Sequence, residues 1–261
     1  MINNEQSPIS NNLILEVKIE TKQNEPESII NLRNIKERQI TEIESFDFRT
    51  IGYSEQEIEQ NENFRKTFNK YLEESDDDPQ KFLDLLEQQG IHTIEKSYFL
   101  KTQQTLAQIG EINKSGTNAM FATQAMIRSY LLENFSGKPQ EELESLLNYT
   151  GVIFLSKNPN KKSIFHEGSH ATQYLLAMNM DAKDEKTRLK REIEVSIALI
   201  RAKISNKLKS VDRGKCHTAV FKVWGEIANF SANDIYQEVD NFYANKKRLL
   251  EIIQAETDNK I

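Results

Sequence analysis

The residues with the clearest chemical potential are five consecutive positions, His166-Glu167-Gly168-Ser169-His170. Two histidines four residues apart lie on one face of a helix, about one turn from each other, so both imidazoles can reach one metal ion. The glutamate between them lies beside that face, where its carboxylate can take a proton from a metal-activated water molecule. The spacing therefore predicts a divalent-metal site that generates hydroxide at neutral pH.

The flanking sequence predicts the elements that must position this motif. Residues 151–156 are a short apolar, β-branched run between a glycine and the turn-forming residues 157–160, which predicts a strand. Ser163 is expected to cap the following helix, which we predict over residues 164–178. Gly168 lies inside that helix and costs about 1 kcal/mol relative to alanine, which a metal and a packed core can offset.

A tetrahedral zinc ion needs a third protein ligand and keeps its last position open to water. The next predicted helix, at about residues 184–209, contains two candidates, Glu192 and Glu194. Lys190 and Arg201 near Glu194 predict a solvated ion pair, whereas Glu192 has mostly apolar neighbours. We therefore expect Glu192 to be the third ligand and keep Glu194 as the alternative. The two glutamates are expected to flank one buried stripe formed by Leu189, Ile193, Ile197, Ile200 and Ile204.

The motif and the candidate third ligand together carry a family resemblance. His166-Glu167-x-x-His170, followed 22 positions later by Glu192-x-Glu194-Val195-Ser196, resembles the gluzincin branch of the zincin metallopeptidases. The resemblance covers about residues 152–204 and implies a zincin-like core of strand, motif helix and third-ligand helix. It implies one Zn²⁺ ion held by His166, His170 and Glu192, with the Ser196 hydroxyl supporting a ligand histidine from outside the coordination sphere. Val195 and Ser196 stand where the family often has alanine and aspartate.

The same resemblance implies a mechanism of peptide hydrolysis. Glu167 would act as the general base, accepting a proton from water and passing it to the leaving amine. A peptide substrate would pair with an exposed sheet edge, which we expect at Val152, Ile153, Phe154 and Leu155. A donor to the developing oxyanion is also expected, and the candidates are His217, Tyr236 and Tyr243.

Composition limits the class of protein. With 261 residues, 38% of them hydrophobic, the chain can bury the core of one domain, or of one domain with a small extension. A single cysteine excludes a disulfide framework and predicts a reducing compartment. A net charge of −6 without a dense basic patch argues against nucleic acid as the main partner. No apolar run approaches ~20 residues and no Sec signal is recognisable, so we expect no membrane span.

The remaining pattern predicts a mainly α fold with a small β-sheet, an α+β class. Residues 1–50 are expected to form a polar N-terminal arm, loose or contributing a strand at residues 13–19, and residues 51–261 a helical zincin-like domain. Helices are predicted at about residues 55–74, 79–89, 117–135, 139–148, 215–230 and 233–256.

These features predict a zinc metallopeptidase that acts on a protein or peptide substrate. We expect it to act in the cytoplasm of the producing cell or, as a bacterial effector delivered by a specialised secretion system, in a host cytosol. Two alternatives stay open. One is a non-catalytic helical interaction protein whose histidine pair is structural, and the other is a zinc hydrolase of a non-peptide bond.

Overall fold

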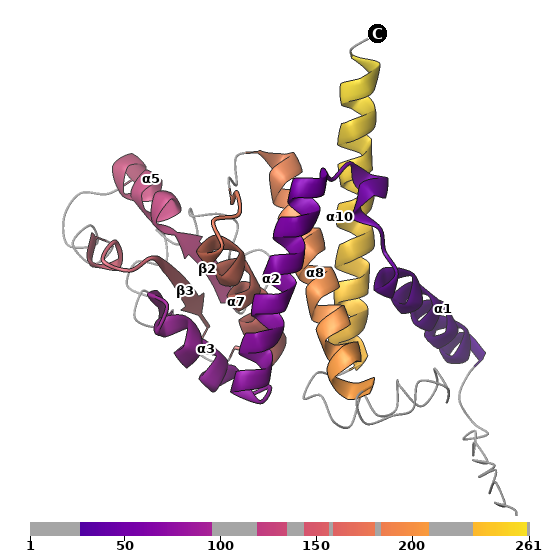
Figure 1. Cartoon of the computed structure of the whole chain (residues 1–261), viewed down its shortest axis with the longest axis horizontal. Coiled ribbons are helices and arrows are strands. Elements are labelled where there is room, and N and C mark those ends of the chain that lie inside the picture. The colour runs from indigo at the N-terminus through magenta and orange to yellow at the C-terminus, as the bar shows by residue number, and fades with distance from the viewer. Residues whose placement is uncertain are drawn as a thin grey trace, which may run out of the picture.

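The computed structural model describes residues 27–95, 119–134, 144–156, 159–180, 184–208 and 232–259. Figure 1 shows long helices on one side of this part of the chain and a small sheet on the other. The predicted α+β class is confirmed, since helices dominate and three strands form one sheet. In chain order the elements are α1 (Glu27–Glu44), the 3₁₀ helix η1 (Phe48–Ile51), α2 (Glu55–Ser75), α3 (Pro79–Glu87), β1 (Ile91–Glu95), β2 (Ala119–Thr123), α5 (Gln124–Asn134), β3 (Gly151–Leu155), α7 (Lys161–Leu175), α8 (Glu185–Leu208) and α10 (Ala232–Asp258).

Side-chain caps define where several helices begin. Ser54 and Glu57 form a reciprocal capping box at the start of α2. The motif helix α7 begins three residues earlier than predicted, because Asn160 accepts a hydrogen bond from the backbone N–H of Ser163 at 2.7 Å. The expectation that Ser163 is the cap is therefore wrong, and Ser163 lies in the first turn.

The sheet has the strand order β1-β3-β2, with β3 parallel to β1 and antiparallel to β2. The predicted strand before the motif helix is thus present as β3, but it lies between two other strands. The expectation that Val152, Ile153, Phe154 and Leu155 form an exposed edge is wrong, because their backbone groups face neighbours on both sides. Among the described strands, the antiparallel edge next to β3 is β2.

Strand β2 replaces the first turns of a predicted helix. The apolar run around Met120 was expected to belong to a helix over residues 117–135, but the helix α5 begins only at Gln124. Residues 119–123 instead pair in full register with β3. Pairing with β3 buries the side chains of Ala119, Phe121 and Ala122. The free energy of this burial outweighs the local preference of the segment for a helix.

Helix α8 is buried on two sides. The predicted stripe is confirmed at Leu189, Ile193, Ile197 and Ile200, which join a core cluster with residues of α1, η1 and α10. A second stripe packs into the cluster that contains α2, α3 and α7, and its members are Val195, Ala198, Leu199 and Ala202. In Figure 1, α8 accordingly runs between α10 and the part of the molecule that carries α7.

Residues 27–44 of the predicted N-terminal arm form helix α1, not a loose segment or a strand. Ile40 and Ile43 are buried, and α1 packs against α8 and α10. The ammonium of Lys36 pairs with Asp240 on α10. The strand-like run at residues 13–19, most of the helix predicted at 139–148, and the helix predicted at 215–230 lie outside the described residues.

Among the described helices, none combines the length and the apolar character needed to cross a membrane.

Gly168 permits α7 to pack closely on α3. A Cβ atom at this position would lie 2.2 Å from Cε1 of Phe82 and 3.1 Å from Cδ1 of Leu86, two fully buried side chains. We expect Gly168→Ala to destabilise the protein, because overpacking costs about 1–3 kcal/mol and exceeds the ~1 kcal/mol that alanine gains in helix propensity. Urea unfolding measures the difference. Glu59→Ala on the exposed face of α2 is the control, and an unchanged or raised midpoint for Gly168→Ala would contradict the prediction.

Candidate metal centre

The structure brings His166, His170 and Glu192 together. One ligand atom from each lies within 4.8 Å of the other two. The carboxylate of Glu192 faces both rings, with Oε2 3.3 Å from Nε2 of His166 and Oε1 3.5 Å from Nε2 of His170. The histidines come from one face of α7, as their spacing predicts, and Glu192 comes from α8 packed beside it.

These distances suit a tetrahedral ion. Zinc bonds of about 2.0–2.1 Å to nitrogen and oxygen place neighbouring ligand atoms of a tetrahedron about 3.3–3.4 Å apart. Each contact of Glu192 is close to that spacing, one through Oε2 and the other through Oε1, and all three donors are of the types that zinc binds in catalytic sites. With one ligand atom from each residue within 4.8 Å of the others, the three side chains can converge on one ion by adjusting their side-chain torsions.

Each histidine also has a partner for its other ring nitrogen. Nδ1 of His170 lies 3.0 Å from Oε1 of Gln173, and Nδ1 of His166 lies 3.4 Å from Oε1 of Glu238. Oxygen acceptors at Nδ1 favour a proton on that nitrogen and leave Nε2 to bind a metal. Both Nε2 atoms are the ones that face Glu192.

Glu238 on α10 belongs to a second set of contacts behind His166. It is buried, lies 3.3 Å from the ammonium of Lys162 and accepts a hydrogen bond from the Ser196 hydroxyl at 3.1 Å. Ser196 thus supports Glu238, not a histidine directly as the resemblance implied. The reason is that the carboxylate of α10 occupies the place between Ser196 and the ring of His166.

The charges of the cluster stabilise one another. Burial opposes a charged His166, but the Glu238 and Glu192 carboxylates outweigh it and raise the pKa of this imidazole well above its usual value. Burial alone would raise the pKa of Glu192, yet His170 and His166 hold it well below the ordinary range. Burial does raise the pKa of Glu167. A divalent cation bound here would take the place of the protons on the imidazoles.

Loss of Glu238 is expected to weaken metal binding. Glu238→Ala removes the acceptor at Nδ1 of His166, and loss of such a partner typically lowers metal affinity about 10–100-fold. Competition with a chromogenic zinc chelator measures the affinity. Glu251→Ala, the same substitution at an exposed position of α10, is the matched control, and equal affinity of the two variants would refute the role of Glu238.

Glu167 reaches the sheet beside the cluster. The backbone N–H of Phe121 in β2 donates to Oε2 of Glu167 at 2.7 Å. In an antiparallel pair the peptide groups of alternate residues face the partner strand or face away from it. Because the N–H of Phe121 serves Glu167, the outward-facing peptide groups of β2 are those of Ala119, Phe121 and Thr123. The side of β2 that faces away from β3 therefore lies next to the carboxylate expected to be the base.

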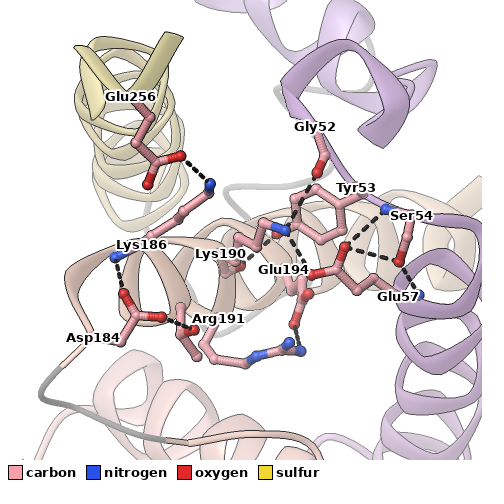
Figure 2. Close-up of polar contacts among 11 residues, drawn as sticks. Gly52, Tyr53, Ser54, Glu57, Asp184, Lys186, Lys190, Arg191, Glu194 and Glu256 are labelled. Carbon is pink, nitrogen blue, oxygen red and sulfur yellow. Dashed lines mark hydrogen bonds and ion pairs between the residues drawn. The ribbon is translucent and has the colours of Figure 1, made fainter. Parts of the chain in front are cut away.

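Glu194 lies outside the metal cluster and is not solvated. Its side chain is fully buried, where its Oε2 accepts hydrogen bonds from Arg191 at 2.6 Å and from Gln173 at 2.8 Å. Burial raises the pKa of Glu194 to about 7 against the opposing charge of Arg191. Figure 2 shows the Arg191–Glu194 pair beside Lys190, which reaches Glu57 instead of Glu194. The predicted solvated pair is thus wrong, because α8 is buried on both sides.

The three residues predicted as candidate oxyanion donors differ in where they lie and in what they contact. His217 lies outside the described residues. The Tyr243 hydroxyl donates to Glu42 of α1 at 2.7 Å, so this group is engaged on the α1 side of α10. The Tyr236 ring lies with its centroid 6.0 Å from the ammonium of Lys36.

Sequence reasoning missed Gln173, Glu238 and the Phe121 N–H. Gln173 follows His170 by three positions, and residues at this spacing are neighbours on a helix surface, so a signal was present. Glu238 lies 42 positions after Ser196, and no local pattern distinguishes it from other glutamates of an amphipathic helix. The Phe121 N–H is a backbone group, which residue types do not mark.

Comparisons with known proteins complete the description of the site. Protein-family models, curated proteins and solved structures were each searched, and none of them matches this chain. The zincin resemblance of the motif residues therefore stays a prediction. Its physical support is the cluster of His166, His170 and Glu192, with Glu167 beside it.

Proposed function

We propose that this chain is a zinc-dependent metallopeptidase that hydrolyses peptide bonds of a protein or peptide substrate. The observation that carries the proposal is the Glu192 carboxylate, set 3.3 and 3.5 Å from the Nε2 atoms of both motif histidines. The donor set of two imidazoles and one carboxylate is that of catalytic zinc sites that keep a position open to water.

Three residues of the chain would bind the metal, and a fourth, Glu167, would transfer the proton. His166, His170 and Glu192 would hold a zinc ion, which when bound would supply a lowered pKa of its water, toward ~7, and a Lewis acid for a carbonyl. Glu167 accepts the proton of the attacking water and transfers it to the leaving amine. The Phe121 N–H holds Oε2 of Glu167, so Oε1 is the oxygen that would accept the proton.

The choice of a peptide as substrate follows from the resemblance of the motif residues to the gluzincins. Strand β2 is the described strand next to the base, but Ala119, Phe121 and Thr123 are buried and the Phe121 N–H already donates to Glu167. An extended peptide would have to displace this contact to pair with β2.

Metal content and peptide cleavage test the proposal together. Elemental analysis of the purified protein should find one zinc per chain, and a library of proteome-derived peptides read by mass spectrometry should show cleavage. A chelator should abolish cleavage and added zinc should restore it. Absence of bound metal would favour a helical interaction protein. Bound zinc with hydrolysis of another bond, and no peptide cleavage, would favour the non-peptide hydrolase.

A further inference from the structure

The side chain of Gln173 connects the metal cluster with the buried ion pair of α8. Gln173 is fully buried, and its amide oxygen lies 3.0 Å from Nδ1 of His170. Its amide nitrogen donates to Oε2 of Glu194 at 2.8 Å and to the carbonyl oxygen of Arg191 at 3.3 Å. One amide group thus touches a motif histidine on one side and two acceptors of α8 on the other.

These partners determine how the amide is oriented. A carboxylate and a backbone carbonyl only accept hydrogen bonds, so a reversed amide would put three oxygens against one another. The oxygen of Gln173 must therefore face His170, and Nδ1 of His170 must carry the proton that it donates. In the neutral imidazole the lone pair is then on Nε2, the nitrogen that faces Glu192.

Glu194 is in turn held rigidly. Arg191 donates to the same Oε2 that receives the Gln173 amide, at 2.6 Å, and Figure 2 shows the guanidinium lying against this carboxylate. A buried ion pair of this kind adds little net stability, but it defines one geometry. The Arg191 carbonyl, which can only accept, and the Glu194 side chain that Arg191 holds together set the orientation of the amide.

We propose that Glu194 and Gln173 are positioning residues that act in series on His170. Glu194 holds the amide nitrogen of Gln173, and the amide oxygen keeps the Nδ1–H of His170 engaged so that Nε2 is presented to the metal. The inference rests on the proposed zinc site. It assigns Glu194, the residue that the sequence offered as an alternative ligand, a different role in the same centre.

An exchange of the two side-chain types tests this series. The variants are Gln173→Ala, Gln173→Glu, Glu194→Gln and the double exchange Gln173→Glu/Glu194→Gln. In the double exchange the carboxylate at position 173 accepts from His170, and the amide at position 194 donates to that carboxylate. The number of charges is unchanged, whereas the hydrogen bond from position 173 to the Arg191 carbonyl is lost, because a carboxylate cannot donate it. Zinc affinity, measured by competition with a chelator, is the readout, because a purely structural role would not move it in this pattern.

Gln173→Ala and Gln173→Glu are expected to bind zinc about 10–100-fold more weakly than the wild type, since the first removes the acceptor of His170 and the second sets two carboxylates against each other. Glu194→Gln is expected to lose less, because its amide oxygen can still accept from Gln173. The double exchange is expected to bind at least about tenfold more tightly than the weaker single variant. Gln56→Glu, the same chemical change at an exposed position of α2, should bind as the wild type does. Urea unfolding of every variant identifies any that is not folded.

Two results would overturn this inference and leave the proposed zinc site intact. One is wild-type zinc affinity in Gln173→Ala, which leaves the Arg191–Glu194 pair intact and so remains informative where Glu194→Gln does not fold. The other is a double exchange that binds as weakly as the summed effects of the single variants. A wild-type protein without zinc affinity would overturn the proposed function together with this inference.

Discussion

Replacing Glu167 by glutamine is expected to lower the rate of peptide hydrolysis by about 10²–10⁴-fold, the usual contribution of a general acid–base group. The amide of Gln cannot accept the proton of the attacking water. Its oxygen can still accept the hydrogen bond that Phe121 donates to Glu167, so the side chain should keep its place beside β2. Initial rates on the best peptide from the library screen measure the effect.

The metal content of Glu167→Gln separates loss of the base from loss of the site. Zinc should remain at one ion per chain, since Glu167 is not among the three clustered ligands. Glu59→Gln, the same substitution at an exposed position of α2, should retain full activity. Undiminished hydrolysis by zinc-loaded Glu167→Gln would show that another group takes the proton.

Glu192→Ala is expected to abolish stable metal binding. It removes the carboxylate that faces both Nε2 atoms and leaves two protein ligands, so the loss of zinc affinity should exceed the ~100-fold limit typical of supporting residues. His166→Ala should have a similar effect for the same reason. Elemental analysis after dialysis, and chelator competition, measure the loss, while circular dichroism reports whether the helices persist.

Glu194→Ala provides the comparison, because it removes another α8 carboxylate only two positions away. Its effect on zinc affinity should stay within about 10–100-fold, since Glu194 contacts Gln173 and Arg191 but neither motif histidine. It should destabilise the protein more than Glu192→Ala does, because Arg191 would be left as a buried, unpaired charge. If Glu194→Ala loses the metal and Glu192→Ala keeps it, the ligand assignment is wrong.

Helix α8 shows how the role of a glutamate depends on what surrounds its helix. Glu192 and Glu194 lie on opposite flanks of the stripe that packs toward α7, formed by Val195, Ala198, Leu199 and Ala202. One flank faces the motif histidines and the other faces Gln173. A helical wheel of α8 contains both flanks, but it cannot say which element lies against each one.

Properties that depend on near neighbours along the chain could be predicted from the residues alone. The spacing of His166 and His170 places both rings on one helical face, and Glu167 must lie beside them. The long helices α2, α8 and α10, and the strand β3, follow from periodicity and flanking turn residues over a few turns. These features need no knowledge of what packs against them.

Contacts between residues far apart in the chain became known from the folded structure. It brought Glu192 to the histidines while burying Glu194, and it carried Glu238 from α10 to His166. It also made β3 central and β2 the edge, because strand pairing joins segments separated by many residues. Such contacts depend on the burial that the whole chain achieves, and local propensity does not encode them.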